Sequence, residues 1–290
     1  MKKKYIYIAL ALMSLSSLEA CKTAGKEANK AETDETAVTE LVLKTDSLTF
    51  EESGDGYSCS IKVDFPENDD KLDLAVKNIL NKTLVQMGPC SGPEEKPQFY
   101  DGDVNKGRQL IDFYGKDFAK KLKTQYDEVK ALNEEREMPA PYTHDVAIRR
   151  VADKEKYATY EVTSYTYLGG AHGSSTNFMV NIDKESAKML EATIDTTKTK
   201  ELQPVLRKGV IDYFKECGET VKDEELDDML FISEGIIPLP AQTPALTPEG
   251  LRFIYQQYEI GPYALGMVSF TVPYDKVREH MTKEAIRLTE

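Results

Sequence analysis

Two hydrophobic periodicities alternate along the chain, and they constrain its fold more than any other feature of the sequence. In residues 57–65, Cys59, Ile61 and Val63 alternate with polar residues, as in a strand with one buried face. After Pro66 the apolar residues recur every three or four positions, as on one side of a helix. The chain must therefore pack amphipathic helices and half-buried strands together.

The same two patterns predict the order of elements along the chain. Strands are expected over residues 41–51, 57–65, 144–151, 157–167, 177–183, 251–258 and 266–273, with 188–194 as a further strand or an irregular return. Helices are expected over residues 72–87, 108–135, 198–217 and 223–230, and from 275 to the end. Residues 90–107 contain proline and glycine and are expected to form a loop.

This order favours an α+β fold with helices packed on antiparallel β-sheet. The strands and helices do not follow a βαβ rhythm, and no nucleotide-type glycine loop occurs. Met138-Pro139-Ala140-Pro141 marks a boundary between two halves. We therefore expect a single compact ectodomain made of an N-terminal half, 41–140, and a C-terminal half, 141–290, which share one core.

The predicted helix over residues 108–135 has two interpretations. Its apolar stripe includes Leu110, Tyr114 and Phe118, and its opposite side carries several lysines. A helix that binds a partner has this pattern, and so does a helix that lies on a sheet, which we favour.

The N-terminus is typical of an export signal. Lys2-Lys3-Lys4 precedes an apolar stretch that is too short for a permanent membrane helix, which needs about 20 residues. Leu18-Glu19-Ala20 before Cys21 resembles a lipobox, so residues 1–20 are predicted to be a lipoprotein signal peptide and Cys21 the lipidated residue. An ordinary secretory signal that ends at a cysteine is the alternative.

Residues 21–40 contain almost no large apolar side chains. Such a segment buries too little surface to offset the entropy of ordering it, so it is predicted to be a flexible tether. No second long apolar run follows, and contact with the membrane is expected through the N-terminal lipid only. The predicted location is the cell envelope, at the periplasmic face or the outer surface of the outer membrane.

The chain is strongly acidic, with a formal net charge of −13 at pH 7. Removal of the basic signal would make the mature chain more negative still. Such a surface repels nucleic acid and anionic head groups, so nucleic acid is not an expected partner. A basic protein or an uncharged glycan is easier to accommodate.

Three cysteines follow Cys21, without a C-x-x-C pair or a cluster with histidine. In an oxidising compartment two of them can pair, and the disulfide candidate is Cys59 with Cys90. Cys217, at a predicted helix end, is then a free thiol, and we expect it to be buried.

Three segments have an unusual composition. The first, residues 165–173, is a strand that runs into a glycine-rich turn containing Gly169, Gly170, His172 and Gly173. The other two are Leu246-Thr247-Pro248-Glu249-Gly250-Leu251 and Tyr258-Glu259-Ile260-Gly261-Pro262-Tyr263-Ala264-Leu265-Gly266. In this order and spacing they resemble a bacterial extracytoplasmic family, domain of unknown function 3298, with RsiV-like and PdaC-like members. The resemblance covers roughly residues 41 to 285 and makes 141–290 the RsiV-like half.

The chain departs from the family pattern in one turn. Relatives usually carry Thr-Gly-Lys after the strand over 177–183, whereas this chain has Asp183-Lys184-Glu185-Ser186-Ala187. The resemblance implies an α+β ectodomain known chiefly as a binding module, with lysozyme as its well-understood ligand. It implies no catalytic residues.

His172 is the residue with the most open interpretation. A histidine between glycines is accessible and can serve as a metal ligand or a general base. The other two histidines, His144 and His280, have no metal-ligand spacing with it. The structural alternative is that its ring bonds to backbone groups in a tight turn, while the glycines adopt positive φ.

Carboxylates and tyrosines offer further candidates. Glu259 could form a glycosidase pair with Glu161 or Asp183, because glycoside hydrolysis needs two carboxylates about 5 to 10 Å apart. The structural alternative is that Glu259 accepts backbone hydrogen bonds beside the Gly-Pro turn. The tyrosines that could line a sugar-binding or protein-binding face are Tyr165, Tyr167, Tyr258 and Tyr263.

The sequence thus predicts an envelope lipoprotein that acts as a non-catalytic binding or sensor module. The predicted ligand is a lysozyme-like muramidase or peptidoglycan, and no cofactor, bound metal or enzymatic activity is expected. The alternative is a cell-wall hydrolase or deacetylase that uses His172 and nearby carboxylates. A purely structural envelope component is the third possibility.

Overall fold

The larger sheet begins with a hairpin between β1 (Thr45–Gly54) and β2 (Tyr57–Pro66). In this computed structural model the described residues are 43–89, 96–132 and 140–290. Only Asp55 and Gly56 separate the two strands, and Gly56 has a φ of 81°. A Cβ on Gly56 would lie 1.9 Å from the Tyr126 ring, so only glycine fits this turn.

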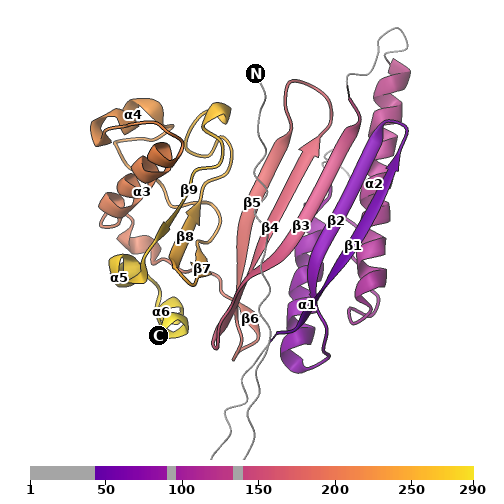
Figure 1. The fold of residues 1–290 in the computed structure, drawn as a ribbon, viewed down its shortest axis with the longest axis horizontal. Helices are drawn as coiled ribbons and strands as arrows, with labels where there is room; N and C mark the ends of the chain where they lie inside the picture. The colour runs from indigo at the N-terminus through magenta and orange to yellow at the C-terminus, as the bar shows by residue number, and fades with distance from the viewer. Residues whose placement is uncertain (1–42, 90–95, 133–139) are drawn as a thin grey trace, which may run out of the picture. The chain divides into compact units, whose positions relative to one another are not determined.

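Two helices follow the hairpin and cover one face of this sheet (Figure 1). The first is α1 (Lys71–Leu84). Asp70 is its N-cap, and the Asp70 side chain accepts hydrogen bonds from the Leu72 and Asp73 amides. A single 3₁₀ turn, η1 (Val85–Met87), completes the helical stretch predicted over 72–87. The second helix, α2 (Gly107–Leu132), confirms the helix predicted from 108, and its apolar stripe lies against β1 and β2.

The strand order of the larger sheet is β1-β2-β3-β4-β5-β6. The remaining strands are β3 (Tyr142–Asp153), β4 (Tyr157–Tyr167), β5 (Ser174–Asp183) and β6 (Lys188–Met189). All neighbours pair antiparallel except β2 and β3, which pair parallel. The expected antiparallel sheet is therefore a mixed sheet, because the two helices between β2 and β3 return the chain to the same end of the sheet.

A smaller antiparallel sheet and a group of short helices form the C-terminal region. The sheet has the order β7-β8-β9, with β7 (Ala245–Thr247), β8 (Gly250–Ile254) and β9 (Ser269–Val272). The helical elements are η2 (Thr196–Lys198), α3 (Gln203–Glu216), η3 (Asp223–Glu225), α4 (Leu226–Met229), η4 (Tyr263–Leu265), α5 (Tyr274–Val277), η5 (Arg278–His280) and α6 (Lys283–Thr289).

Several C-terminal elements are shorter than predicted. The predicted final helix is interrupted at Met281, which forms an isolated β-bridge with Ile194, and Thr282 then caps α6. Helix α3 begins at Gln203 instead of residue 198, because Pro204 favours the first turn of a helix. Residues 188–194 are a short strand followed by an irregular return, one of the two expected forms.

The hydrophobic core has two main clusters within one compact unit, residues 40–290. The first cluster takes residues from Leu43 to Ile182 and lies between the helices α1 and α2 and the larger sheet. The second takes residues from Ala152 to Leu288 and surrounds the smaller sheet. The clusters overlap in sequence, because Ala152 of β3 and Tyr157 of β4 belong to the second cluster, and the predicted boundary at 138–141 stays a prediction.

Buried polar side chains join the two sheets. Asn181 on β5 donates to the Pro244 carbonyl at 3.0 Å and accepts from the Leu246 amide at 2.8 Å. The Thr159 hydroxyl on β4 donates to the Leu246 carbonyl at 2.7 Å. Because each of these groups is buried and bonded, β7 is fixed against the larger sheet. Among the described residues no helix is both long and apolar enough to cross a membrane.

Candidate binding cleft

The turn between β4 and β5 meets the connection between β8 and β9 at one end of the two sheets (Figure 1). His172, from the turn, stacks on Tyr263, with ring centroids 3.8 Å apart and an interplanar angle of 19°. Tyr258 lies beside Tyr263 at a centroid distance of 5.6 Å. Three of the residues singled out in the sequence therefore form one aromatic cluster, although 86 positions separate His172 from Tyr258.

The Gly173 carbonyl holds this cluster together. It accepts a hydrogen bond from His172 Nδ1 at 3.0 Å and from the Tyr263 hydroxyl at 3.1 Å. With Nδ1 as the donor, the neutral ring leaves Nε2 as an acceptor, and the Tyr258 hydroxyl lies 3.5 Å from it. The ring of His172 thus bonds to backbone in a tight turn, as the structural interpretation expected, while its second nitrogen faces the exposed tyrosine.

The glycines of the turn have two different reasons to be glycine. Gly169 and Gly170 have φ values of 84° and 97°, which confirms the expected positive φ at these positions. Gly173 does not have positive φ. It is restricted by packing instead, because a Cβ there would lie 2.4 Å from the ring of Tyr165.

Tyr258 combines exposure with an unusual backbone. It has a φ of 67°, a left-handed conformation that side chains other than glycine and asparagine rarely adopt, and it is 55% exposed. The backbone is held by Glu259, whose carboxylate accepts hydrogen bonds from the amides of Gln256 and Ala241, each at 2.6 Å. The left-handed backbone costs free energy and places the ring of Tyr258 in solvent. Strained, exposed residues of this kind are typical of binding sites.

A cleft of about 380 Å³ opens next to the aromatic cluster. Its volume lies within the usual range of small-ligand sites. The wall carries hydroxyl groups from alternate positions of β4 and β5, together with two histidines: Ser164, Thr166, Ser174, Thr176, His144 and His172. The structure therefore places His172 at the border of an open cleft with a polar, uncharged wall.

His144 in the cleft wall is fixed and neutral. Its Nε2 lies 2.7 Å from the Met87 carbonyl and must donate, so Nδ1 accepts from the Thr166 hydroxyl at 2.8 Å. Burial lowers the pKa of His144 to about 4, against the opposing effects of the Met87 hydrogen bond and of Asp145. His144 is therefore a structural residue of the cleft wall, and both of its ring nitrogens are hydrogen-bonded and not free to bind a metal.

The proposed glycosidase carboxylates have structural partners. Both oxygens of Glu259 accept backbone hydrogen bonds, as the structural alternative expected. Glu161 accepts from the Asn177 side chain at 3.1 Å, and Asn177 in turn exchanges two backbone hydrogen bonds with the Gln256 side chain. Glu161 and Glu259 thus lie at the two ends of a hydrogen-bond chain that joins β5 to the β8–β9 connection.

Asp183 lies elsewhere in the sheet. It pairs with Tyr157, whereas Glu161 is four residues farther along β4, a separation of about 13 Å at the usual strand rise. Its carboxylate binds the Ser186 hydroxyl and Arg287, which together with a backbone hydrogen bond lower its pKa against the effect of burial. Asp183 closes a turn, and among the described residues its hydrogen bonds and ion pairs do not involve the aromatic cluster.

Metal ligands are not assembled in the part of the chain that the structure describes. No group of three or more His, Cys, Asp or Glu side chains there could hold an ion. His280 is buried in the C-terminal region and contacts the neighbouring Glu279 at 3.4 Å. His280 therefore lies apart from the cleft that His144 and His172 both line.

The comparisons with known proteins cover most of the described region. Residues 52–175 match the family model described as deacetylase PdaC. Residues 187–275 match the model described as a protein of unknown function, DUF3298. The chain contains a DUF3298/PdaC-like domain. The two matched ranges are separated by residues 176–186, which include most of β5.

Solved structures share the fold of the DUF3298/PdaC-like domain. A DUF3298 family member from Bacteroides fragilis NCTC 9343 has a TM-score of 0.61 at 20% identity, covering 86% of this chain and 96% of that one. A DUF3298 family protein from Pseudomonas aeruginosa PAO1 has a TM-score of 0.55 at 15% identity, covering 85% and 97%. At these identities the likeness concerns the fold alone. Among curated proteins no match was found.

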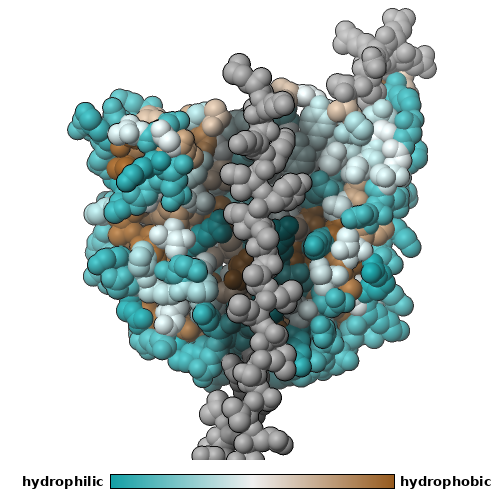
Figure 2. All heavy atoms as spheres, in the orientation of Figure 1, coloured by the Kyte–Doolittle hydropathy of each residue, from teal (hydrophilic) through white to brown (hydrophobic). Residues whose placement is uncertain are grey.

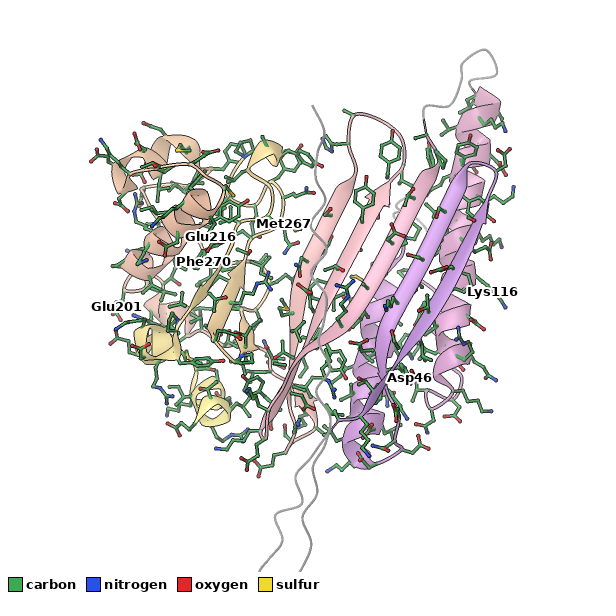
Figure 3. The ribbon with its side chains drawn as sticks, in the orientation of Figure 1. Asp46, Lys116, Glu201, Glu216, Met267 and Phe270 are labelled. Atoms are coloured by element: carbon green, nitrogen blue, oxygen red, sulfur yellow. The ribbon has the colours of Figure 1, made fainter. Side chains whose placement is uncertain are left out.

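One tyrosine of the DUF3298/PdaC-like domain lines a second cleft. Tyr165 is 41% exposed and lies on the face of the larger sheet that the helices leave open, beside a cleft of about 430 Å³. Met267 also lines this cleft, and Figure 3 places it between β9 and the larger sheet. Tyr167 is less exposed and donates to the Gly170 carbonyl at 3.2 Å. Tyr258 and Tyr263 therefore belong to the aromatic cluster, whereas Tyr165 and Tyr167 support the turn.

The cysteine predictions have different outcomes. Cys59 is buried on β2, and burial raises the pKa of its thiol to about 12. Its predicted partner Cys90 lies outside the described residues, so the disulfide stays a prediction. Cys217 is exposed, and the expectation that it is buried is wrong, because it forms the C-terminal cap of α3 beyond the last buried turn. The signal, Cys21 and the tether also lie outside the described residues.

Sequence reasoning missed the polar residues that shape the cleft. On β4 the buried face is apolar at Tyr160 and Val162 and then changes to Ser164 and Thr166 at the next same-face positions. Such a change within one strand indicates where the core ends, and it was readable from the sequence. No comparable sequence pattern indicated that the Gln256 side chain would bond to the backbone of Asn177 on β5.

Proposed function

We propose that this extracytoplasmic DUF3298/PdaC-like domain is a non-catalytic binding module whose ligand enters the cleft beside His172. The observation that carries the proposal is the exposed Tyr258, which stands on a left-handed backbone at the aromatic cluster. An aromatic ring with an open face offers contact area at a low cost in conformational entropy.

The cleft wall favours an uncharged, hydroxylated ligand. Ser164, Thr166, Ser174 and Thr176 can each donate and accept hydrogen bonds, and among the described residues no carboxylate lines this cleft. A sugar ring has the matching chemistry, with hydroxyl groups for the wall and an apolar face for a tyrosine ring. Peptidoglycan is therefore the ligand that we propose for this cleft.

A lysozyme-like muramidase is the second candidate ligand, and charge favours it. The chain has a net charge of −13, and a basic protein would be attracted to it at low salt. The visible face in Figure 2 is mainly hydrophilic, with hydrophobic residues in small separate patches. Such a surface is better suited to an electrostatic partner than to an apolar one.

The location that we propose is the cell envelope, with Cys21 as the lipid-anchored residue. The basic and apolar N-terminus, followed by the lipobox-like Leu18-Glu19-Ala20, supports it. Mass spectrometry of the mature N-terminus would detect acyl groups on Cys21, and an unmodified N-terminus there would contradict the anchor.

Co-sedimentation of the full chain with purified peptidoglycan tests the binding proposal. We expect saturable binding that Tyr258→Ala weakens about tenfold, the effect of losing roughly 1.4 kcal/mol of contact. Phe99→Ala is the matched control, because Phe99 is 51% exposed and belongs neither to the cleft lining nor to the aromatic cluster. Equal binding by wild type and Tyr258→Ala would contradict the proposed site.

Two further measurements separate the other possibilities. Calorimetry against lysozyme at low and high salt tests the muramidase, for which we expect binding that weakens as salt rises. Release of sugar or acetate from peptidoglycan by the wild type, lost in His172→Ala, would favour the hydrolase or deacetylase alternative over a binding module.

A further inference from the structure

A third cavity, larger than the two clefts described above, lies beside α1 on the helix-covered side of the larger sheet. Its volume is about 580 Å³, which is within the range of small-ligand sites. One wall is α1, with Ile79 and Lys82, and the opposite wall is β5, with Phe178 and Val180. The return after β5, residues 187–191, forms the third side. We call this cavity the α1–β5 groove.

The groove exists because the helix layer is narrower than the sheet. Helices α1 and α2 pack mainly on β1, β2 and β3, so the same face of β5 has no helix of its own. Phe178 and Val180 point to this face, since they pair with Val162 and Tyr160 of the core. Phe178 is nevertheless only partly buried. Apolar surface that would normally be covered is therefore open to a ligand.

The third side of the groove has two unusual residues. Met189 is 52% exposed although it lines an apolar cavity, and methionine adapts readily to the shape of a ligand. Ala187 has a φ of 55°, a conformation that favours glycine. The side chain of Ala187 packs against the first core cluster. This contact offsets the unfavourable backbone conformation where the chain turns beside the groove.

The charges at the groove are unlike those of the chain as a whole. Lys82 comes from α1 and Lys188 from β6, and both side chains line the groove. Neither lysine has an ion-pair partner among residues 43–89, 96–132 and 140–290. Glu191 is the single acidic residue among the described residues of the lining. The groove is therefore net positive in a chain whose net charge is −13.

We propose that the α1–β5 groove binds a single-chain anionic amphiphile, of which a fatty acid is the simplest example. The alkyl chain would lie against Ile79, Phe178 and Met189, where burying apolar surface stabilises it by about 25 cal/mol per Å². The anionic head would pair with Lys82 or Lys188. This site is separate from the proposed glycan cleft, although Gln86 lines both, and it does not depend on what the cleft binds.

Isothermal titration calorimetry of the full chain, kept free of detergent, tests the proposal with decanoate as the probe. We expect one saturable site for decanoate, at least tenfold weaker binding of 1-decanol, and no binding of acetate. The paired substitution Lys82→Gln with Lys188→Gln is expected to weaken decanoate binding about tenfold and to leave 1-decanol unchanged. The charge-matched control is Lys116→Gln with Lys120→Gln, which removes two exposed lysines of α2 that lie outside the groove.

A second variant tests the apolar part of the groove. Met189→Glu places a carboxylate among the alkyl contacts and is expected to abolish decanoate binding. Met229→Glu is the control, because Met229 is 37% exposed on α4, outside the groove. Circular dichroism checks that both variants fold. Decanoate binding that Met189→Glu leaves unchanged, or no decanoate binding by the wild type, overturns the proposal, and neither result bears on peptidoglycan binding at the cleft.

Discussion

The C-terminal region contacts β5 in two places that differ in chemistry. At the closed junction, Asn181 is buried and bonds to the backbone on both sides of Ala245. At the open junction, the stacked rings of His172 and Tyr263 and the side chain of Gln256 make the contact, with water nearby. The larger sheet and the C-terminal region are thus joined in one place by a buried, hydrogen-bonded amide and in another by solvent-accessible rings.

The difference indicates where the fold can respond to a ligand. A buried amide with both ends bonded has no alternative partner, so the closed junction is expected to be rigid. Ring stacking and partly exposed hydrogen bonds can exchange with a ligand or with water at a lower cost in free energy. The candidate cleft lies at the second kind of junction.

The largest expected effect is on stability at the closed junction. Asn181→Ala leaves the buried Leu246 amide without an acceptor and should lower the free energy of unfolding by about 3 kcal/mol. Gln256→Ala at the open junction should cost about 1 kcal/mol, because water can replace its bonds to Asn177. Urea denaturation of both variants measures the contrast, and equal losses would remove the distinction between the junctions.

Acid sensitivity should come from His144 in the wall of the cleft. The folded-state pKa of His144 is about 4, below the unfolded value near 6.5, so the unfolded state binds more protons between these values. The free energy of unfolding is therefore highest above pH 6.5, where His144 is neutral in both states, and it decreases as the pH falls toward 4. The slope of unfolding free energy against pH should reach up to about 1.4 kcal/mol per unit there.

One variant isolates that slope. His144→Gln removes the buried imidazole and should flatten the slope relative to the wild type. Denaturation curves at several pH values between 4 and 7 provide the measurement. An unaltered slope in His144→Gln would assign the acid sensitivity to other groups.

The smallest expected effect concerns the backbone at Tyr258. Tyr258→Ala loses the ring contact with Tyr263 but keeps a Cβ at a φ of 67°, whereas Tyr258→Gly loses the ring and relieves the backbone. The glycine variant should therefore be more stable than the alanine variant by about 1 kcal/mol. Thermal unfolding compares the two. If alanine is the more stable, the backbone at this position is not strained.

The sequence predicted the elements well where one periodicity extends over a whole segment. Helices α1 and α2 and strands β2 to β5 fall within a few residues of the predicted ranges, because each buries one regular face. The prediction was poorer after residue 190, where short elements end at tertiary contacts such as the bridge between Ile194 and Met281. Periodicity cannot report a contact between segments that are far apart in the sequence.

The candidate site was predicted in part. Composition singled out His172, Tyr258 and Tyr263, and the structure brings these three together. The parallel pairing of β2 with β3 and the hydroxyl wall of the cleft were not foreseen. Both depend on which strands become neighbours, and that follows from how helices cross the sheet, which residue types alone do not specify.

The parallel pairing also determines the order in which the sheet can form. The β1–β2 hairpin can close locally, but β2 has no second neighbour until the chain has been made beyond Tyr142 and both helices have folded back. Until then the edge of β2 is open to pairing with another chain. We therefore expect the β2–β3 pair to be the slow step of folding, and substitutions there to affect the yield of folded protein more than its final stability.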